Sequence, residues 1–315
     1  MKALEGLKIL DFTTLLPGPY ATLVLADLGA EVLKVSSPSK RDIVLEYEPF
    51  VEGTDIAANE AWLGRNKQNI FLNLKHPKAI AIVKRLIQEY DIVIEQFRPG
   101  VMEKLGLGYE ALKAVNPALI YCSLTGYGQT GPNRHLAGLG TPLQAFSGMT
   151  YMQGYEDRPP VSPPFALADY VAGLNAVIGT MLALYHRDAL KGKAQEVDVS
   201  LYEGIFRMEE SFVAELDILK RVHGRSPMSK GVSCPIGTFR TKDGAYAIMV
   251  CSTNPVFDHL CDAMDKREEW LPKYATAKDR LADPNPIMDA VTEWFSSQTF
   301  DEVKARCDEA GVPIS

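Results

Sequence analysis

Apolar and polar positions change period repeatedly along the first two-thirds of the chain, and this pattern predicts an α/β fold. Short apolar or alternating runs, typical of strands, lie at 7–12, 31–35, 69–73, 92–95, 119–123 and 195–200. Segments with helical spacing lie at 19–28, 78–90, 109–115, 163–185 and 201–221. Strands that each precede a helix indicate a mainly parallel, doubly wound sheet, in which ligands bind at the carboxyl ends of the strands.

The pattern changes after residue 221, where a polar segment with the composition of a linker, VHGRSPMSK, occupies 222–230. Two strands, 237–240 and 246–251, follow, and an Asp-Gly turn joins them as a hairpin. Helices then dominate, with Asn254 and Thr299 as candidate N-caps and Glu302 completing a capping box with Thr299. We therefore expect a large Rossmann-like domain over 1–221, a linker over 222–230 and a small α+β domain over 231–315.

Composition excludes several functions. The formal net charge of −7 argues against nucleic acid as the main partner. The five cysteines are widely spaced without a metal-binding pattern, which is typical of reduced residues in the cytoplasm. No signal core and no run of about eighteen uninterrupted apolar residues occurs, so no membrane association is expected. The first βα turn, TTLLPGP at 13–19, lacks the G-x-G-x-x-G pattern, which makes NAD an unlikely ligand.

One acidic residue, Asp169, lies where the apolar stretch 163–185 turns from an extended run into a helix. An aspartate at such a junction is most often an N-cap, and this alternative stays open. Because Phe165, Leu167 and Tyr170 flank it, the carboxylate would be poorly hydrated, which favours a raised pKa or a role as nucleophile. Small residues at helical spacing further along predict that this helix packs closely against a neighbour.

Unusual residues gather after the predicted strands. Glycines at 125–132, with Gly138 and Gly140, would let the backbone approach a ligand closely, although turn formation explains any single one. Lys75, Arg98 and Lys104 would pair with phosphates, whereas each alone is explained as a solvated side chain. Only their convergence on strand ends indicates an anion site.

Several motifs together resemble the class III CoA-transferases, which include formyl-CoA transferase, carnitine CoA-transferase and related acyl-CoA racemases. These motifs are LDFTTLLPGP, LADLGAEVLKV, NKQNIFLNLK, VIEQFRPG, SLTGYGQTGP, LADYVAGL and KGKAQEVDVSLYEG. The resemblance runs over essentially the whole chain. It implies CoA as the co-substrate, a Rossmann-like large domain, and an interlocked homodimer of ring-shaped subunits, with no metal.

The resemblance also implies roles for individual residues. The catalytic aspartate of the family corresponds to Asp169. The family's CoA contacts correspond to Leu16, Pro17, Leu72, Asn73, Leu74, Lys75, Gln96, Phe97, Arg98, Lys104, Ala137, Gly138, Leu139 and Gly140. The implied reaction moves CoA from an acyl-CoA thioester to a carboxylic acid through an aspartyl-CoA intermediate.

Two alternatives remain beside the transferase. A racemase or isomerase of this family needs a second acid/base, a histidine in a Gly-His-Asp run, where this chain has Gly138, Leu139 and Gly140. Leucine carries no proton, and His135 lies four residues earlier, so the transferase is favoured. A non-catalytic CoA-binding paralogue would bind CoA without forming a covalent adduct.

The chain differs at several positions from the family that it resembles. Ser36 and Ser37 replace a glutamate and a basic or proline residue, which changes the expected adenine end of the CoA site. Ala137 and Leu139 replace polar residues of the formyl-CoA enzyme, which argues against oxalate and formate. The segments SLYEGIFRMEESF and GRSPMSKG are most similar to carnitine CoA-transferase. Relatives continue beyond the final AGVPIS and return to complete the large domain, so we expect either that this return segment is absent from the chain or that the fold closes differently.

Overall fold

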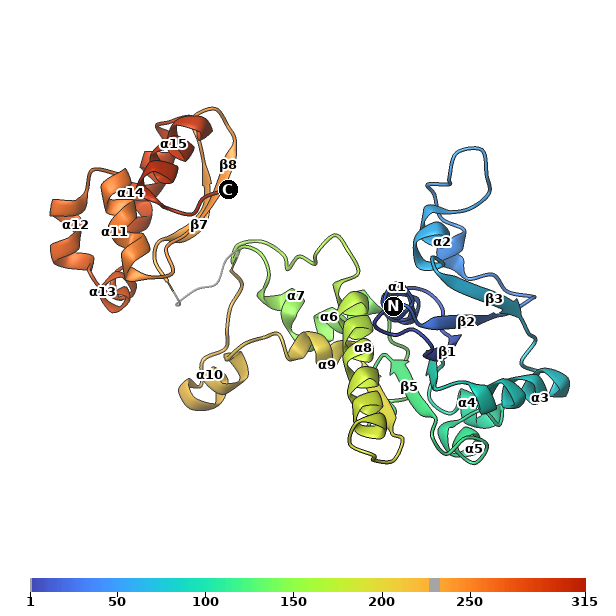
Figure 1. The fold of residues 1–315 in the computed structure, drawn as a ribbon. Helices are drawn as coiled ribbons and strands as arrows, with labels where there is room; N and C mark the ends of the chain where they lie inside the picture. The colour runs from blue at the N-terminus through green and yellow to red at the C-terminus, as the bar shows by residue number, and fades with distance from the viewer. Residues whose placement is uncertain (1, 227–232) are drawn as a thin grey trace. The chain divides into compact units, whose positions relative to one another are not determined.

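A computed structural model describes residues 2–226 and 233–315 of the chain. Its internal contacts divide the described residues into a large unit, up to Met152 with Val161–His223, and a small unit, Gln153–Pro160 with Gly224–Ser315 (Figure 1). Each unit has its own hydrophobic core. The predicted linker, 222–230, lies partly outside the described residues.

The large unit is built on a sheet of six parallel strands in the order β3-β2-β1-β4-β5-β6. The strands are β1 (Lys8–Phe12), β2 (Glu31–Ser36), β3 (Lys67–Phe71), β4 (Ile92–Glu95), β5 (Ile120–Thr125) and β6 (Glu196–Ser200). The predicted α/β fold with a parallel sheet is therefore confirmed. The strand order reverses between β1 and β4, and a crevice opens outside the carboxyl ends of the strands at such a switch point.

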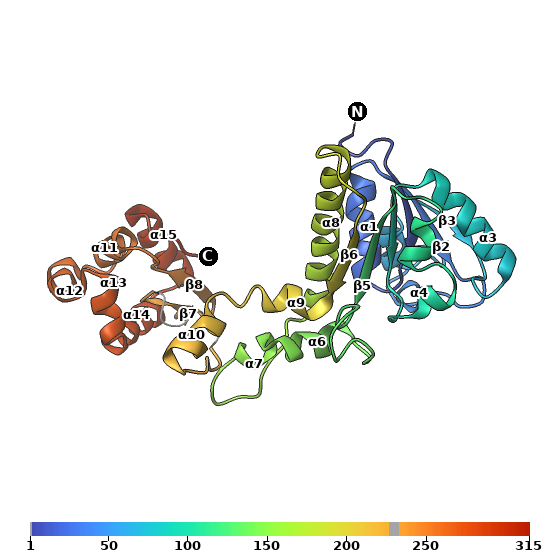
Figure 2. The same cartoon turned by 90° about the horizontal axis from the view of Figure 1, so that it is seen from below.

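Helices cover both faces of this sheet (Figure 2). The helices of the large unit are α1 (Pro17–Asp27), α2 (Ala58–Leu63), α3 (Pro77–Leu86), α4 (Val101–Lys104), α5 (Tyr109–Lys113), α6 (Gly140–Ser147), α7 (Met149–Met152), α8 (Leu167–Asp188), α9 (Leu201–Phe206) and α10 (Phe212–Leu219), with 3₁₀ turns η1 (Ile43–Leu45) and η2 (Ile87–Glu89). Successive residues of a strand face opposite sides, so Ile9 packs with α1 and α8 while Leu10 packs with α3, α4 and α5.

Helix α8 packs against α1 at close range, as its small residues predicted. A β-carbon placed on Gly173 would lie 2.8 Å from the carbonyl oxygen of Pro17 and 2.9 Å from the Tyr20 ring, so only glycine permits this approach. Ala172 and Ala176 are fully buried in the same core. Because α8 returns the chain to the start of the parallel strand β6, its first turn lies at the carboxyl edge of the sheet.

The small unit combines one hairpin with helices around a separate core. Its elements are β7 (Ile236–Arg240), β8 (Tyr246–Val250), α11 (Asn254–Ala263), α12 (Arg267–Tyr274), α13 (Ala277–Ala282), α14 (Asn285–Ser296) and α15 (Phe300–Ala310). The hairpin is antiparallel, as its Asp-Gly turn predicted, and Gly244 has a φ of +85°. The capping box of Thr299 and Glu302 is confirmed, whereas Thr253 and not Asn254 caps α11.

Three sequence expectations were wrong in detail. The single helix expected over 201–221 is two helices, α9 and α10, separated by a turn in which Glu210 has a φ of +51°. The third strand begins and ends two residues before 69–73. Helix α2 was not predicted, because it is short and the loop around it is polar.

Candidate active site

The switch point of the sheet brings together two of the segments predicted to bind a ligand. Leu16 and Pro17 follow β1 and begin α1, while Gln96, Phe97 and Arg98 follow β4. These strands are neighbours, and the side-chain oxygen of Gln96 accepts a hydrogen bond of 3.0 Å from the backbone N–H of Gly18. The two loops are therefore held as one surface.

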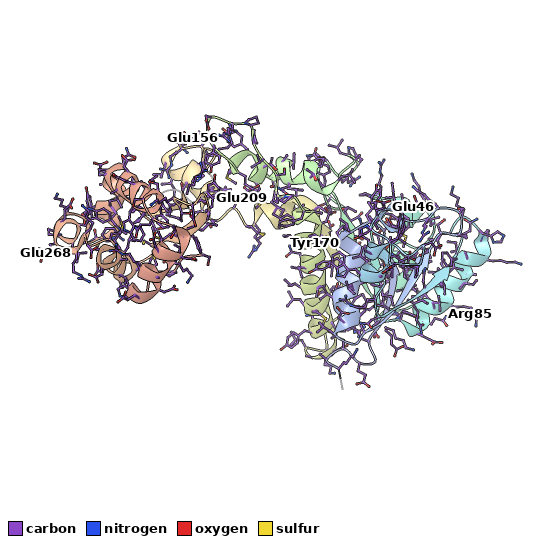
Figure 3. The ribbon with its side chains drawn as sticks, turned by 90° about the horizontal axis from the view of Figure 1, so that it is seen from above. Glu46, Arg85, Glu156, Tyr170, Glu209 and Glu268 are labelled. Carbon is purple, nitrogen blue, oxygen red and sulfur yellow. The ribbon has the colours of Figure 1, made fainter. Side chains whose placement is uncertain are left out.

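Asp169 lies in the first turn of α8, beside Tyr170, which is labelled in Figure 3. The N-cap interpretation of Asp169 was wrong, because Ala166 is the N-cap and no side chain caps this helix. Since Gly173, one turn further along α8, contacts Pro17, the carboxylate lies close to the loop that follows β1.

Gly140 forms the floor beneath this carboxylate, and Gly138 lies two residues before it in the chain. A β-carbon on Gly140 would lie 1.9 Å from Oδ2 of Asp169 and 3.3 Å from Oδ1, so the carboxylate rests directly on the glycine backbone. Gly140 is the first residue of α6, and Gly138 packs against Gly126 of the loop after β5, where a β-carbon on Gly138 would lie 2.9 Å from the Gly126 α-carbon. The predicted glycine segments thus converge on Asp169.

The electrostatic environment of Asp169 matches the predicted poor hydration. The residue is half-buried, and burial raises the pKa of its carboxyl group to about 6, with only its own backbone N–H acting in the opposite direction. Within 2–226 and 233–315, no cation forms an ion pair with it. Phe165, expected to shield it, has 57% of its surface exposed, whereas Tyr170 packs edge-on against Tyr20.

The remaining predicted CoA contacts divide by burial. Leu72, Leu74 and Phe97 are half-buried against the core that α3, α4 and α5 form. Asn73 accepts a hydrogen bond of 3.1 Å from the backbone N–H of Lys75. Exposed positions are Asn73, Lys75, Arg98, Lys104, Ala137 and Leu139. Lys75, Arg98 and Lys104 have no ion-pair partner within the described ranges, so their charges are free to meet an anion.

A buried charge cluster beneath the β1 loop escaped sequence reasoning. Asp11 is fully buried and accepts hydrogen bonds from Thr13 Oγ1 and Thr22 Oγ1, both at 2.6 Å. Lys67 Nζ lies 3.6 Å from Asp11 Oδ2, and Lys34 Nζ donates to the carbonyl of Thr13. A charged residue inside the apolar run 7–12 was the available signal, but its partners lie far away in sequence.

This cluster borders a cavity of about 330 Å³ near the ends of β2 and β3. Lys34, Lys67 and Ser36 line it together with Leu15 and Asn69. Ser36 donates a hydrogen bond of 2.8 Å to Asn69 inside this wall. The cavity therefore adjoins the β1 loop and contains one of the two serines that depart from the family pattern.

Fold and site define a protein of the Rossmann-like α/β class, with a switch point between β1 and β4 and a poorly hydrated carboxylate in the first turn of α8. A family model described as CoA-transferase family III matches residues 4–315. The chain belongs to CoA-transferase family III, and it is an enzyme of this class that uses CoA thioesters.

Curated relatives and solved structures agree. The succinyl-CoA–L-malate CoA-transferase alpha subunit of Chloroflexus aurantiacus is 36% identical, over 99% of this chain and 73% of the relative. The human succinyl-CoA:glutarate CoA-transferase is 34% identical, over 99% and 71%. A crystal structure of a CaiB/BaiF family protein from Brucella suis is 32% identical with a TM-score of 0.84, covering 100% of this chain and 83% of that one.

Proposed function

We propose that this enzyme transfers CoA from an acyl-CoA thioester to a carboxylic acid, with Asp169 as the nucleophile. The observation that carries the proposal is the position of Asp169, whose half-buried carboxylate rests on Gly140 without a cation partner in the described residues. With a pKa of about 6, the group is mostly ionised at neutral pH. It is also less stabilised by solvent than an exposed carboxylate, which makes it a better nucleophile.

The chemistry balances in a relay of acyl groups. The Asp169 carboxylate attacks the thioester carbonyl, the C–S bond breaks, and CoA leaves as a thiolate while an acyl-aspartyl anhydride forms. The thiolate then attacks the Asp169 carbonyl, which releases the donor carboxylate and leaves an aspartyl-CoA thioester. The acceptor carboxylate repeats these two steps in reverse, so that the acceptor departs as its CoA thioester and Asp169 is restored.

CoA itself is held by the residues that correspond to the CoA contacts of the family. Lys75, Arg98 and Lys104 are exposed cations suited to the phosphates of the nucleotide. Adjacent strands lie about 4.8 Å apart, so an extended ligand is needed to reach from the loop after β3 to the switch point. The pantetheine arm of CoA supplies that length, and binding energy from the nucleotide positions the thioester at Asp169.

For the substrate, we favour a succinyl-CoA donor and a dicarboxylic acid acceptor. Both curated relatives are named for succinyl-CoA, one with L-malate and one with glutarate. The carnitine assignment rested partly on GRSPMSKG, most of which lies outside the described residues. That assignment stays a prediction with no described binding surface for a trimethylammonium group.

We also propose that the enzyme is a homodimer of interlocked subunits in the cytoplasm. Leu174, Ile178, Leu182 and Tyr185 form a stripe along α8 with exposed fractions of 44–63%. Helix α8 is also long and apolar enough to cross a membrane, but core helices of soluble proteins meet the same criteria of length and composition. A second subunit would cover the stripe. Because the Chloroflexus relative is named an alpha subunit, light scattering should be run with the chain alone.

The test of this function is a transfer assay with a matched variant. Purified enzyme is incubated with succinyl-CoA and a panel of acids, including L-malate, glutarate, oxalate and carnitine, and new thioesters are measured by chromatography. We expect transfer to dicarboxylates and a loss of at least about a thousandfold in Asp169→Asn, which keeps the size of the side chain but not its nucleophile. Full activity in Asp169→Asn would refute the proposal. Solvent deuterium uptake at the α-carbon without an acceptor would instead identify an isomerase.

A further inference from the structure

A second buried carboxyl group, Glu95, lies directly before the loop 96–98. It is the last residue of β4 and has only 3% of its surface exposed. Its Oε2 accepts a hydrogen bond of 2.8 Å from the backbone N–H of Phe97. This bond fixes the backbone at the point where the chain leaves the sheet and enters the loop.

Among the residues that the structure describes, no cation compensates the charge of Glu95. Burial raises the pKa of Glu95 to about 7, while the Ser123 hydroxyl and the Phe97 N–H act in the opposite direction. The other charged groups that act on it are Glu103 of α4 and Glu196 of β6, which both raise its pKa. Burial is the main cause of the raised pKa values of Tyr121 and Cys122 on the neighbouring strand β5, and the charge of Glu95 adds to both shifts.

On the neighbouring strand β1, another carboxylate accepts a hydrogen bond from a backbone N–H two residues further on, but different charges surround it. On β1, Oδ1 of Asp11 accepts a hydrogen bond of 2.8 Å from the N–H of Thr13, again two residues further on. Phe12 is the register partner of Glu95 and Ile94 that of Asp11, so the two anchors lie on adjacent strands at the switch point and on opposite faces of the sheet. Burial alone would raise the pKa of Asp11, but Lys34 and Lys67 hold it low, whereas no cation of the described residues acts on Glu95 in this way.

We propose that Glu95 is a positioning residue for CoA, which holds the Phe97 backbone so that the loop 96–98 is presented to the carrier. The inference rests on the proposed function, because it requires that CoA binds this loop. Glu95 does not touch the ligand, since it is buried beneath the loop. An ionised carboxylate accepts a stronger hydrogen bond than a neutral carboxyl group. CoA affinity therefore rises as Glu95 loses its proton, around neutral pH.

The experiment measures CoA binding to the full chain by isothermal titration calorimetry at about pH 6, 7 and 8. All proteins carry Asp169→Asn, which removes the titration of that carboxylate. The parent, which keeps Glu95, is compared with two variants. In Glu95→Gln the amide oxygen still accepts a hydrogen bond from the Phe97 N–H, whereas Glu95→Ala leaves that N–H unpaired. Glu110→Gln on α5 is the control, because this exposed glutamate pairs with Lys113 and makes no bond to the loop.

The parent and Glu110→Gln should gain affinity by the same factor between pH 6 and 8, part of it from the phosphate of CoA itself. In Glu95→Gln the gain of CoA affinity between pH 6 and 8 should be several-fold smaller than in the parent. Glu95→Ala should bind CoA roughly tenfold more weakly than the parent at every pH. Equal pH dependence in the parent and Glu95→Gln would overturn the proposal, even if Glu95→Ala fails to fold. Absence of CoA binding in every protein, the parent included, would instead refute the proposed function.

Discussion

Two aspartates of the large unit, Asp11 and Asp169, lie toward the same edge of the sheet but in opposite environments. Asp11 is fully buried, and although burial alone would raise the pKa of its carboxyl group, Lys34, Lys67 and two threonine hydroxyls hold it below its ordinary value. Asp169 is only half-buried, yet burial raises its pKa to about 6, because no cation in the described ranges compensates the loss of water.

The difference shows that partners, more than depth, decide what a buried carboxylate can do. The oxygens of Asp11 are occupied by Thr13, Thr22 and Lys67, so they shape the β1 loop and cannot attack a thioester. The oxygens of Asp169 rest on glycine and accept no bond from another side chain in the described part of the chain. A poorly hydrated carboxylate without a side-chain partner destabilises the folded protein, and groups of this kind are typical of catalytic sites.

The largest expected effect is on stability at Asp11. Asp11→Ala leaves the buried ammonium group of Lys67 without its counter-charge, so the free energy of unfolding should fall by about 3 to 5 kcal/mol. Asp169→Ala removes no bond to another described side chain and relieves a poorly hydrated charge, so at neutral pH the free energy of unfolding should not fall and should rise if it changes. Urea denaturation of both variants and of the unmodified protein measures these changes in the free energy of unfolding. A similar loss in the two variants would break the contrast between the aspartates.

The next effect concerns the glycine seat of Asp169. In Gly140→Ala the new β-carbon would lie 1.9 Å from Oδ2, so the carboxylate must move by an ångström or more. A displacement of that size should lower kcat/KM by about a hundredfold while the protein stays folded. Gly224→Ala, where no atom of the described residues lies within 4 Å of the added carbon, is the matched control. Unchanged kinetics in Gly140→Ala would show that the carboxylate does not depend on this seat.

The smallest effect is the pH dependence that the two carboxylates impose. Because the pKa of Asp169 is about 6, transfer should rise about tenfold per pH unit below 6 and level off above 7. The folded state binds this proton more tightly than the unfolded chain, so its contribution to stability is present below about pH 4 and is lost as the pH rises through 6. Asp169→Asn should remove this decline. Asp11, with a lowered pKa, contributes the opposite slope at lower pH.

Local patterns predicted the parallel sheet and the ends of β4, and small residues predicted the close packing of α8. The position of Asp169 at the start of that helix followed from the same pattern, but its role as N-cap did not, because Ala166 begins the helix one turn earlier. The break between α9 and α10 escaped prediction, since one residue at positive φ interrupts an otherwise helical pattern.

Long-range pairing was the harder part of the site. Lys67 contacts Asp11 from the edge strand β3, two strands away in the sheet, and no spacing rule connects them. Glu95 reads in sequence as one more residue of a short strand, and only its burial and its bond to Phe97 distinguish it. Sequence therefore located the loops of the site but not the buried charges that hold those loops.

The central claim is that Asp169 becomes covalently linked to the donor acyl group or to CoA during turnover. The direct measurement is mass spectrometry of the peptide that contains Asp169, after incubation with succinyl-CoA and trapping with hydroxylamine or borohydride. We predict a hydroxamate or a reduced aspartyl side chain at this residue, absent from Asp169→Asn. Continued transfer with no modification of that peptide, or with modification at another residue, would contradict the account.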